Sequence, residues 1–176
     1  MNFCSQCGHP VAHQIPPGDD RQRYMCNHCG AIHYQNPRII AGTLPVWQQQ
    51  ILLCRRAIAP RQGYWTLPAG FMENGETTRQ AAARETWEEA LARVEVGELY
   101  TITSIPHINQ VQMLYLAELP HPEYAAGPES TEVRLFSEEE IPWDELAFLT
   151  ISNALKLYFE DRRNGVFPTR HIDLNH

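Results

Sequence analysis

The chain has 176 residues, of which 43% are hydrophobic, and its formal net charge is −7. This length fits one main domain of roughly 100–200 residues with at most a small second unit. The acidic balance argues against a surface that neutralises phosphates, so we expect no nucleic-acid partner. The N-terminus lacks the layout of a signal peptide, and no apolar run reaches the roughly 18 residues of a membrane span. We therefore expect a soluble, cytoplasmic protein that does not contact a membrane.

The first 34 residues hold four of the five cysteines, in two C-x-x-C pairs with eighteen residues between them. This spacing is typical of a zinc ribbon, in which four thiolates close a tetrahedral Zn²⁺ site that is structural. Iron in a rubredoxin-like site is the alternative. The segment is too poor in apolar residues to fold without such a staple. We predict a zinc ribbon over residues 1–34, with the ligands Cys4, Cys7, Cys26 and Cys29.

A larger domain follows over residues 35–163. The runs "RIIAGTLPVW" and "QQQILLCRRAI" predict paired strands, and two further strands are expected in "RVEVGELYTITSI" and "NQVQMLYLAEL". The segment from Thr77 to Ala90 has strong helix formers and no internal Gly or Pro, so it predicts a helix. A second helix is expected from an apolar stripe that begins at Ile151. Residues 164–176 have little periodicity and are interpreted as a tail that a partner orders.

The first predicted helix contains "RETWEEAL", which places Glu85, Glu88 and Glu89 on one side at spacings i, i+3 and i+4. Like charges at these spacings destabilise a helix unless a cation lies between them, and carboxylate oxygens are the ligands that Mg²⁺ or Mn²⁺ prefers. Arg84 is suited to hold the carboxylates in place, because its guanidinium is planar and can pair with two of them. Taken alone, such a fragment is more often a solvated helix face.

The wider context decides between these two readings. The stretch "GFMENGETTRQAAARETWEEALA", from Gly70 to Ala92, resembles the signature of the Nudix hydrolases, with all its charged positions present. The resemblance implies an α/β fold, the Nudix α/β/α sandwich around a mixed sheet, here preceded by a zinc ribbon. It also implies metal-dependent hydrolysis of a nucleoside diphosphate linked to another moiety.

The resemblance assigns residues to the site. Mg²⁺ or Mn²⁺ would bind the three helix glutamates and the carbonyl of Ala69. A later glutamate completes such sites, and of Glu129 and Glu132 the second fits the family layout better. The general base is Glu85 or Glu132, which the sequence does not choose between, and Arg84 supports it. An aromatic pocket for the substrate's ring would draw on Phe71 and Phe148.

Two positions depart from the signature. Thr86 replaces an aliphatic residue, and Leu91 replaces the glycine that turns the chain after the helix. Because leucine resists positive φ angles far more than glycine does, we expect a different helix exit, such as an extra turn.

The choice of substrate also follows from resemblance. Zinc ribbons precede Nudix domains in NADH pyrophosphatases, but their motif S-Q-P-W-P-F-P-x-S is absent from the corresponding "SIPHINQVQM". The chain instead resembles plant plastid-type Nudix hydrolases, which act on FAD and ADP-ribose, so we expect these substrates first and NADH second. Such proteins are commonly dimers, which implies a homodimer. The alternative is a non-catalytic nucleotide sensor whose zinc ribbon contacts a partner.

Overall fold

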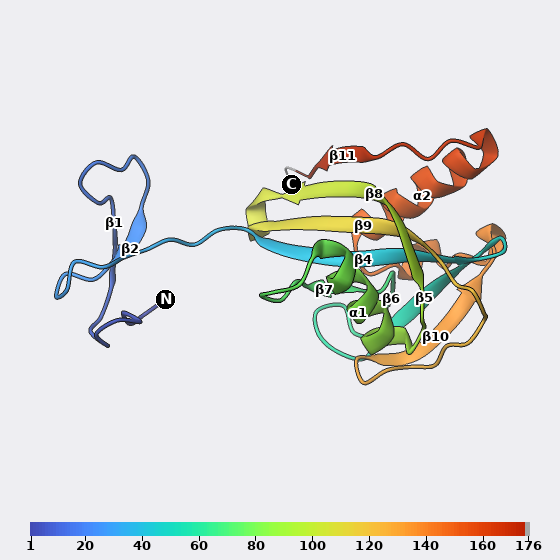
Figure 1. The fold of residues 1–176 in the computed structure, drawn as a ribbon, viewed down its shortest axis with the longest axis horizontal. Helices are drawn as coiled ribbons and strands as arrows, with labels where there is room; N and C mark the ends of the chain where they lie inside the picture. The colour runs from blue at the N-terminus through green and yellow to red at the C-terminus, as the bar shows by residue number, and fades with distance from the viewer. Residues whose placement is uncertain (175–176) are drawn as a thin grey trace. The chain divides into compact units, whose positions relative to one another are not determined.

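The computed structural model describes residues 1–174 and divides the chain into two compact units, Met1–Pro37 and Arg38–His176 (Figure 1). The smaller unit is a three-stranded antiparallel sheet. Its strands are β1 (Ala12–Gln14), β2 (Arg23–Met25) and β3 (Ile32–His33). Among the described residues, no helix is long and apolar enough to cross a membrane.

The larger unit is built on one sheet with the strand order β10-β5-β4-β9-β8-β11, to which β6 and β7 add at β5 and β4. The pairs β4–β9 and β8–β11 are parallel and the other pairs are antiparallel, so the sheet is mixed. The strands are β4 (Arg38–Trp47), β5 (Gln50–Arg56), β6 (Trp65–Thr66), β7 (Ala69–Phe71), β8 (Glu95–Ile105), β9 (Gln110–Glu118), β10 (Ser130–Phe136) and β11 (Arg170–Asp173). The helices are α1 (Thr78–Ala90) and α2 (Leu149–Asn164), with short 3-10 turns at Pro106–Ile108, Glu138–Glu140 and Trp143–Glu145.

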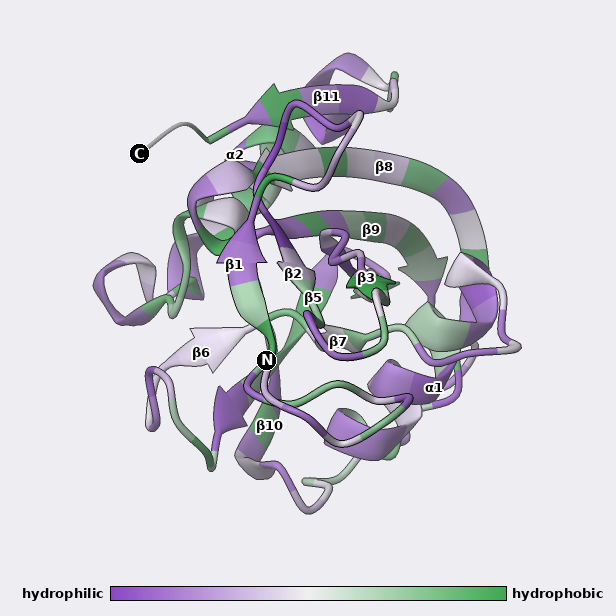
Figure 2. Ribbon diagram, turned by 90° about the vertical axis from the view of Figure 1, so that its left-hand side faces the viewer, coloured by the Kyte–Doolittle hydropathy of each residue, from purple (hydrophilic) through white to green (hydrophobic). Residues whose placement is uncertain are grey.

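The two helices cover opposite faces of this sheet. Successive strand residues point to opposite faces, so Leu44 and Ala41 of β4 face different layers. Leu44 packs in a cluster with Ile151 and Leu155 of α2, whereas Ala41 packs with residues of α1. Figure 2 shows the matching alternation of hydrophobic and hydrophilic residues along β8. The predicted α/β/α sandwich around a mixed sheet is therefore confirmed.

The sheet opens between β4 and β5. These strands pair only beside their connecting turn, at Val46 with Ile51 and Trp47 with Gln50. Farther along, β4 pairs with β7 and β5 pairs with β6, so the short segment from Trp65 to Phe71 bridges the opening. This separation leaves room inside the sandwich beside the N-terminal half of β4.

The segment after α2 forms a strand within the chain itself. β11 adds to the edge of the sheet, parallel to β8. It is also fixed from α2: Arg170 donates to both carboxylate oxygens of Asp161, which is 3% exposed and accepts a further hydrogen bond from Tyr100 (2.7 Å). The sequence interpretation of residues 164–176 as a partner-dependent tail thus differs from the structure over residues 164–174, and residues 175–176 lie outside the described part of the chain. The reason is that the buried carboxylate that binds Arg170 lies in a helix that was interpreted only from its apolar stripe.

The exit from α1 also differs from the expectation. The helix ends at Ala90, and Leu91 itself adopts the left-handed conformation (φ 46°, ψ 29°) that the family's glycine would adopt, so there is no extra turn. The strain of about 1–2 kcal/mol is offset because the 125–127 segment, which is distant in the chain, is hydrogen-bonded to the helix end. The amide of Ala125 donates to Ala90 O (2.8 Å), and that of Gly127 donates to Glu89 O (3.0 Å).

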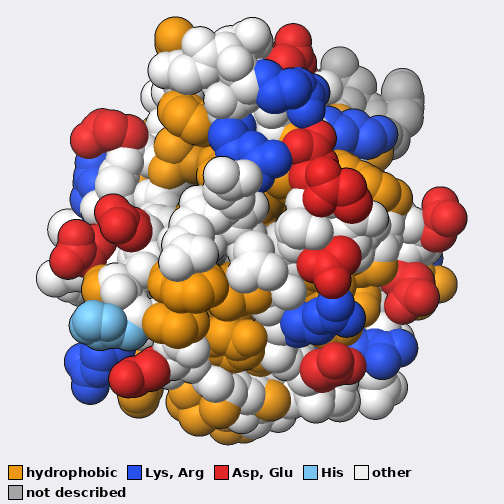
Figure 3. Space-filling view, turned by 90° about the vertical axis from the view of Figure 1, so that its right-hand side faces the viewer, with side chains coloured by type: hydrophobic (Ala, Val, Ile, Leu, Met, Phe, Trp, Pro, Cys, Tyr) orange, Lys and Arg blue, Asp and Glu red, His pale blue; other side chains and the backbone are white. Residues whose placement is uncertain are grey.

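Acidic and basic side chains are interspersed over one face of the molecule (Figure 3). The surface ion pairs include Glu138 with Arg162 and with Arg163. This face offers no continuous field of one sign that would steer a polyanion.

We predict that Arg170→Ala destabilises the protein by about 2 kcal/mol at neutral pH, because it leaves the Asp161 carboxylate buried without its charge partner. Arg170 holds the pKa of Asp161 below its ordinary value. The stabilisation is therefore complete above the unfolded pKa of about 3.9 and is lost as the pH falls below it. Urea unfolding of both proteins at several pH values should show their difference shrinking on acidification.

Arg163→Ala is the matched control, because Arg163 is 60% exposed in its pair with Glu138 and lies at the same end of α2. We expect it to cost no more than about 0.5 kcal/mol. Equal effects of the two substitutions would contradict the role of the buried carboxylate.

Candidate functional site

Helix α1 lies close to the sheet because the face it buries is made of small residues. It begins with a capping box, in which the Thr77 hydroxyl oxygen accepts from the amide of Gln80 and the Gln80 side-chain oxygen accepts from the amide of Thr77. Its buried residues include Ala81 and Ala82. Thr86, the departure from the signature, is fully buried and hydrogen-bonds to Thr43 Oγ1 of β4 at 2.6 Å. The hydroxyl therefore has a partner in this fold, which explains why an aliphatic residue is not needed there.

Two glycines, Gly70 of the bridging segment and Gly42 of β4, allow close packing beside the helix carboxylates. A Cβ added to Gly70 would lie 2.3 Å from Glu85 Oε2, so the carboxylate packs directly on the glycine. A Cβ on Gly42 would likewise lie 2.3 Å from Ala69 Cβ. Ala69 is therefore held against β4, beside the acidic edge of α1.

Arg84 binds the carboxylates together, as its position next to Glu85 suggested. Its guanidinium donates to both oxygens of Glu76 (3.0 and 2.8 Å), to Glu85 (2.8 Å) and to Glu88 (3.0 Å). A further bond reaches the carbonyl of Phe71 (3.1 Å). The hydrogen bond from Arg84 lowers the pKa of Glu76 to about 2, so Glu76 remains an anion that anchors the arginine. Arg84 is thereby fixed beside the two carboxylates.

Glu89 has no such partner. It is 6% exposed, and its Oε2 is buried without a hydrogen bond among residues 1–174. Burial raises the pKa of Glu89 to about 8, and the charge of Glu85 adds to this effect. Burial also raises the pKa of Glu85, against the opposing effect of Arg84. Two neighbouring carboxylates that are costly to ionise together, one with an unpaired oxygen, fit the binding of a divalent cation.

These carboxylates line a cavity of about 1120 Å³. The cavity includes Glu85, Glu88 and Glu89 of α1 together with the bridging residues Ala69 and Gly70. It therefore brings together the metal-binding residues that the sequence suggested, except for Glu132.

Glu129, not Glu132, lines the cavity among the residues that the structure describes. A bulge in β10 pairs Ser130 with Arg56 and Glu132 with Arg55. Arg56 lines the cavity, whereas the carboxylate of Glu132 lies 3.6 Å from Arg55 on the surface. The charge of Glu129 contributes to raising the pKa values of both Glu85 and Glu89. The geometry thus favours Glu129, the alternative, because an irregular strand breaks the alternation on which the expectation depended.

Both aromatic residues proposed for substrate binding lie in the cavity wall, each beneath an arginine. The guanidinium carbon of Arg38 is 4.3 Å from the ring centroid of Phe71, and that of Arg56 is 5.2 Å from Phe148. The two arginines were missed because they lie at strand ends far from the signature, and only the strand pairing brings them to the site. Trp65 of β6, by contrast, is 5% exposed and packs edge-on to Phe136 in the core.

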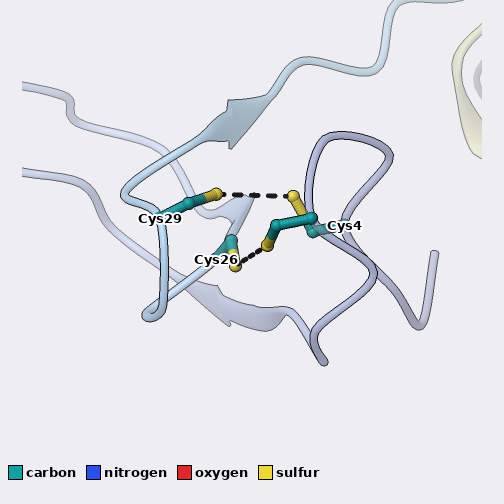
Figure 4. A group of neighbouring side chains, drawn as sticks. Cys4, Cys26 and Cys29 are labelled. Atoms are coloured by element: carbon teal, nitrogen blue, oxygen red, sulfur yellow. Dashed lines mark hydrogen bonds between the residues drawn. The ribbon is translucent and has the colours of Figure 1, made fainter.

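The four ribbon cysteines converge from two loops (Figure 4). Their sulfur atoms all lie within 4.8 Å of one another, with Cys4 and Cys29 at 3.7 Å and Cys7 and Cys26 at 3.5 Å. Zn–S bonds of about 2.3 Å in a tetrahedron require sulfur atoms about 3.8 Å apart, so the cluster fits zinc. All four thiols are free of disulfides.

Comparisons with known proteins agree with this geometry. The family model of the NUDIX domain matches residues 36–157, and the family model of the Nudix N-terminal zinc ribbon matches residues 2–35. A NAD-capped RNA hydrolase NudC from Edwardsiella ictaluri is 36% identical over 129 residues, which cover 71% of this chain and 45% of that protein. The corresponding protein of Salmonella typhi is 30% identical over 80% of this chain and 53% of its own. The chain spans about half the length of these curated relatives.

Solved structures extend the likeness. A NUDIX hydrolase from Nitrosomonas europaea is 55% identical, with a TM-score of 0.93 over 99% of this chain and 100% of that one. An ADP-ribose pyrophosphatase from Streptococcus suis shares the fold, with a TM-score of 0.61 at 22% identity over 77% of this chain and 99% of that one.

The fold and its acidic cavity are those of a metal-dependent α/β/α hydrolase domain. With its match over residues 36–157, the chain belongs to the Nudix hydrolase family, and an N-terminal zinc ribbon precedes its catalytic domain. Nudix enzymes use Mg²⁺ or Mn²⁺, and the four-cysteine cluster supports a structural Zn²⁺, so both expected cofactors agree with the findings.

We predict one zinc per chain by metal analysis. Chelation should remove the protection of residues 1–37 from hydrogen exchange and leave that of the larger unit unchanged, because the small unit lacks a core of its own. Cys4→Ser should have the same effect as chelation. The control is Cys54→Ser, which replaces a buried core thiol and should keep the zinc. A full-length protein that folds its ribbon without metal would contradict the assignment.

We also predict that Glu89→Gln abolishes Mg²⁺-dependent turnover while stabilising the metal-free protein by about 1–3 kcal/mol at pH 7, since it removes a buried unpaired carboxylate. Added Mg²⁺ should raise the melting temperature of the wild type but not of the variant. Glu88→Gln is the control: its carboxylate is 52% exposed, so turnover should fall with little change in stability. A loss of stability in Glu89→Gln would make Glu89 a structural residue.

Proposed function

We propose that this protein hydrolyses the diphosphate bond of dinucleotides or nucleoside diphosphate derivatives, with FAD or ADP-ribose preferred and NADH second. The observation that carries the proposal is the buried Glu89, whose Oε2 has no hydrogen-bond partner among residues 1–174 and which lies with Glu85 and Glu88 on a cavity of about 1120 Å³. A cavity of this size has room for a dinucleotide. The Arg–Phe pairs in its wall offer flat, cationic surfaces for the substrate's rings and phosphates.

In this proposal, Mg²⁺ or Mn²⁺ binds Glu85, Glu88, Glu89 and the carbonyl of Ala69. Glu129 supplies the later carboxylate in place of Glu132. The cations would neutralise the diphosphate oxygens and lower the pKa of a bound water. Arg84 fixes the orientation of the carboxylates, and its tether to Glu76 keeps it from binding the substrate itself.

The remaining role is that of the general base, which takes the proton of the attacking water. Glu85 is proposed for this role over Glu132, because it lies in the cavity wall and its buried carboxylate has a raised pKa, which favours accepting a proton. Arg84 holds Glu85 at 2.8 Å and so limits the positions that its carboxylate can take.

A second candidate substrate is a dinucleotide cap on RNA, because the curated relatives are named for NAD-capped RNA. This is at odds with the expectation of no nucleic-acid partner, which rests on the net charge of −7. We favour the free dinucleotide as the substrate. A dinucleotide carries few phosphates and needs no basic surface, whereas binding of a long RNA chain would need one. A cytoplasmic location and a homodimer also remain part of the proposal, supported by the family resemblance.

The test is a comparison of rates on FAD, ADP-ribose, NADH and NAD-capped RNA with Mg²⁺ and with Mn²⁺. We expect the highest kcat/KM on FAD or ADP-ribose, a lower value on NADH, and none without a divalent cation. Tenfold faster hydrolysis of NAD-capped RNA than of NADH would favour the second candidate. If no substrate is hydrolysed although nucleotides bind, the protein is instead a nucleotide sensor.

A further inference from the structure

One wall of the cavity is a cross-strand array that includes the C-terminal edge of the sheet. In the strand pairing, Ile40 of β4 is opposite Gln112 of β9, which is opposite Thr103 of β8. The amide of Leu174, just after β11, donates to Ser104 O at 2.9 Å and so brings the end of the described chain to the same wall. The cavity residues of this wall are Arg38, Ile40, Ile105, Gln110, Gln112 and Leu174.

Gln112 stands out in this wall. It is 5% exposed, yet its Oε1 has no hydrogen-bond partner among residues 1–174. An unpaired buried amide oxygen costs roughly 1–3 kcal/mol, and most buried polar groups in folded proteins avoid this cost. Its neighbours in the pairing are Ile40, which is apolar, and Thr103. Folding alone therefore gives no reason for an amide at this position of the cavity.

The aromatic ring of Phe71 offers a flat surface in the same row of paired residues. Phe71 is opposite Ile40 on one side, and Gln112 is opposite Ile40 on the other. With strands about 4.8 Å apart, the backbones of Phe71 and Gln112 are separated by about 10 Å. This distance accommodates a purine ring that stacks near Phe71 and extends its polar edge to the amide. Arg38 lies over the Phe71 ring and adds positive charge at the same end.

We propose that Gln112 is a specificity-determining residue, whose amide oxygen accepts a hydrogen bond from the exocyclic amino group of the substrate's purine. The inference deepens the proposed function and rests on it for the identity of the substrate class. Such an amide–aminopurine contact gives selectivity because a ring without the amino group leaves the buried oxygen unpaired.

The experiment uses Gln112→Met in the full-length chain, because methionine has nearly the shape of glutamine but no amide. Substrates are ADP-ribose and its analogue with an unsubstituted purine, with Mg²⁺ present. We expect KM for ADP-ribose to rise roughly tenfold with kcat nearly unchanged, since the contact is made equally in the ground and transition states. The analogue should already bind weakly to the wild type and should not be affected by the substitution.

The matched control is Thr101→Val. Thr101 is 1% exposed, and within the described part of the chain its hydroxyl also lacks a hydrogen-bond partner and does not line the cavity. Both substitutions should leave the folded protein as stable as before or more so, because each removes an unpaired polar group. Only Gln112→Met should change KM. An unchanged KM for ADP-ribose, or equal losses on both substrates, would overturn the role of Gln112.

The outcome also separates the two proposals. If the wild type hydrolyses ADP-ribose and Gln112→Met does so with the same KM, only the inference about Gln112 fails. If the wild type hydrolyses no dinucleotide, the proposed function fails, and calorimetric titration with AMP still tests Gln112. Weaker AMP binding by Gln112→Met than by Thr101→Val then supports the inference, and equal binding refutes it.

Discussion

Burial of two neighbouring carboxylates at the edge of α1 is the constraint on which the rest of the catalytic unit depends. Glu85 and Glu89 would repel each other in any compact fold, and burial makes their charges more costly still. The charge of Arg56 offsets this cost at Glu89 only in part, and among residues 1–174 one oxygen of Glu89 is left without a hydrogen bond. It leaves the negative charge in place for cations to neutralise, so stability of the metal-free chain is sacrificed for affinity.

The surroundings of these carboxylates make the arrangement rigid. Small residues bring α1 close to the sheet, and Gly70 lets the Glu85 carboxylate rest on the backbone. Arg84 spans Glu76 and Glu85, so its own charge is already committed within the protein. The opening between β4 and β5 provides the space, because these strands pair only near their turn. Three parts of the fold thus serve the site: the packing of α1 positions the carboxylates, Arg84 pairs with them, and the opening between β4 and β5 gives access to them.

Much of the site could be predicted because its main elements are local in sequence. The i, i+3 and i+4 spacing of the glutamates on a helix fixes their common side without any tertiary contact. The cysteine pairs are equally local, and their sulfur atoms converge as expected. Predictions failed where a distant contact intervened. Leu91 accepts the left-handed conformation because the 125–127 segment binds the helix end, and a bulge in β10 turns Glu132 toward Arg55.

The sequence by itself determined the two metal-binding motifs, because each depends on residue type at short, regular spacings, and its resemblance to the Nudix signature implied the family and the sandwich fold. Only the tertiary structure decided which later glutamate reaches the cavity, that Leu174 just after β11 joins its wall, and that Arg38, Arg56 and Gln112 line it. The physical reason is that strand register and bulges set these positions. Register is fixed by pairing between strands that are far apart in the chain, and no local pattern of residues encodes it.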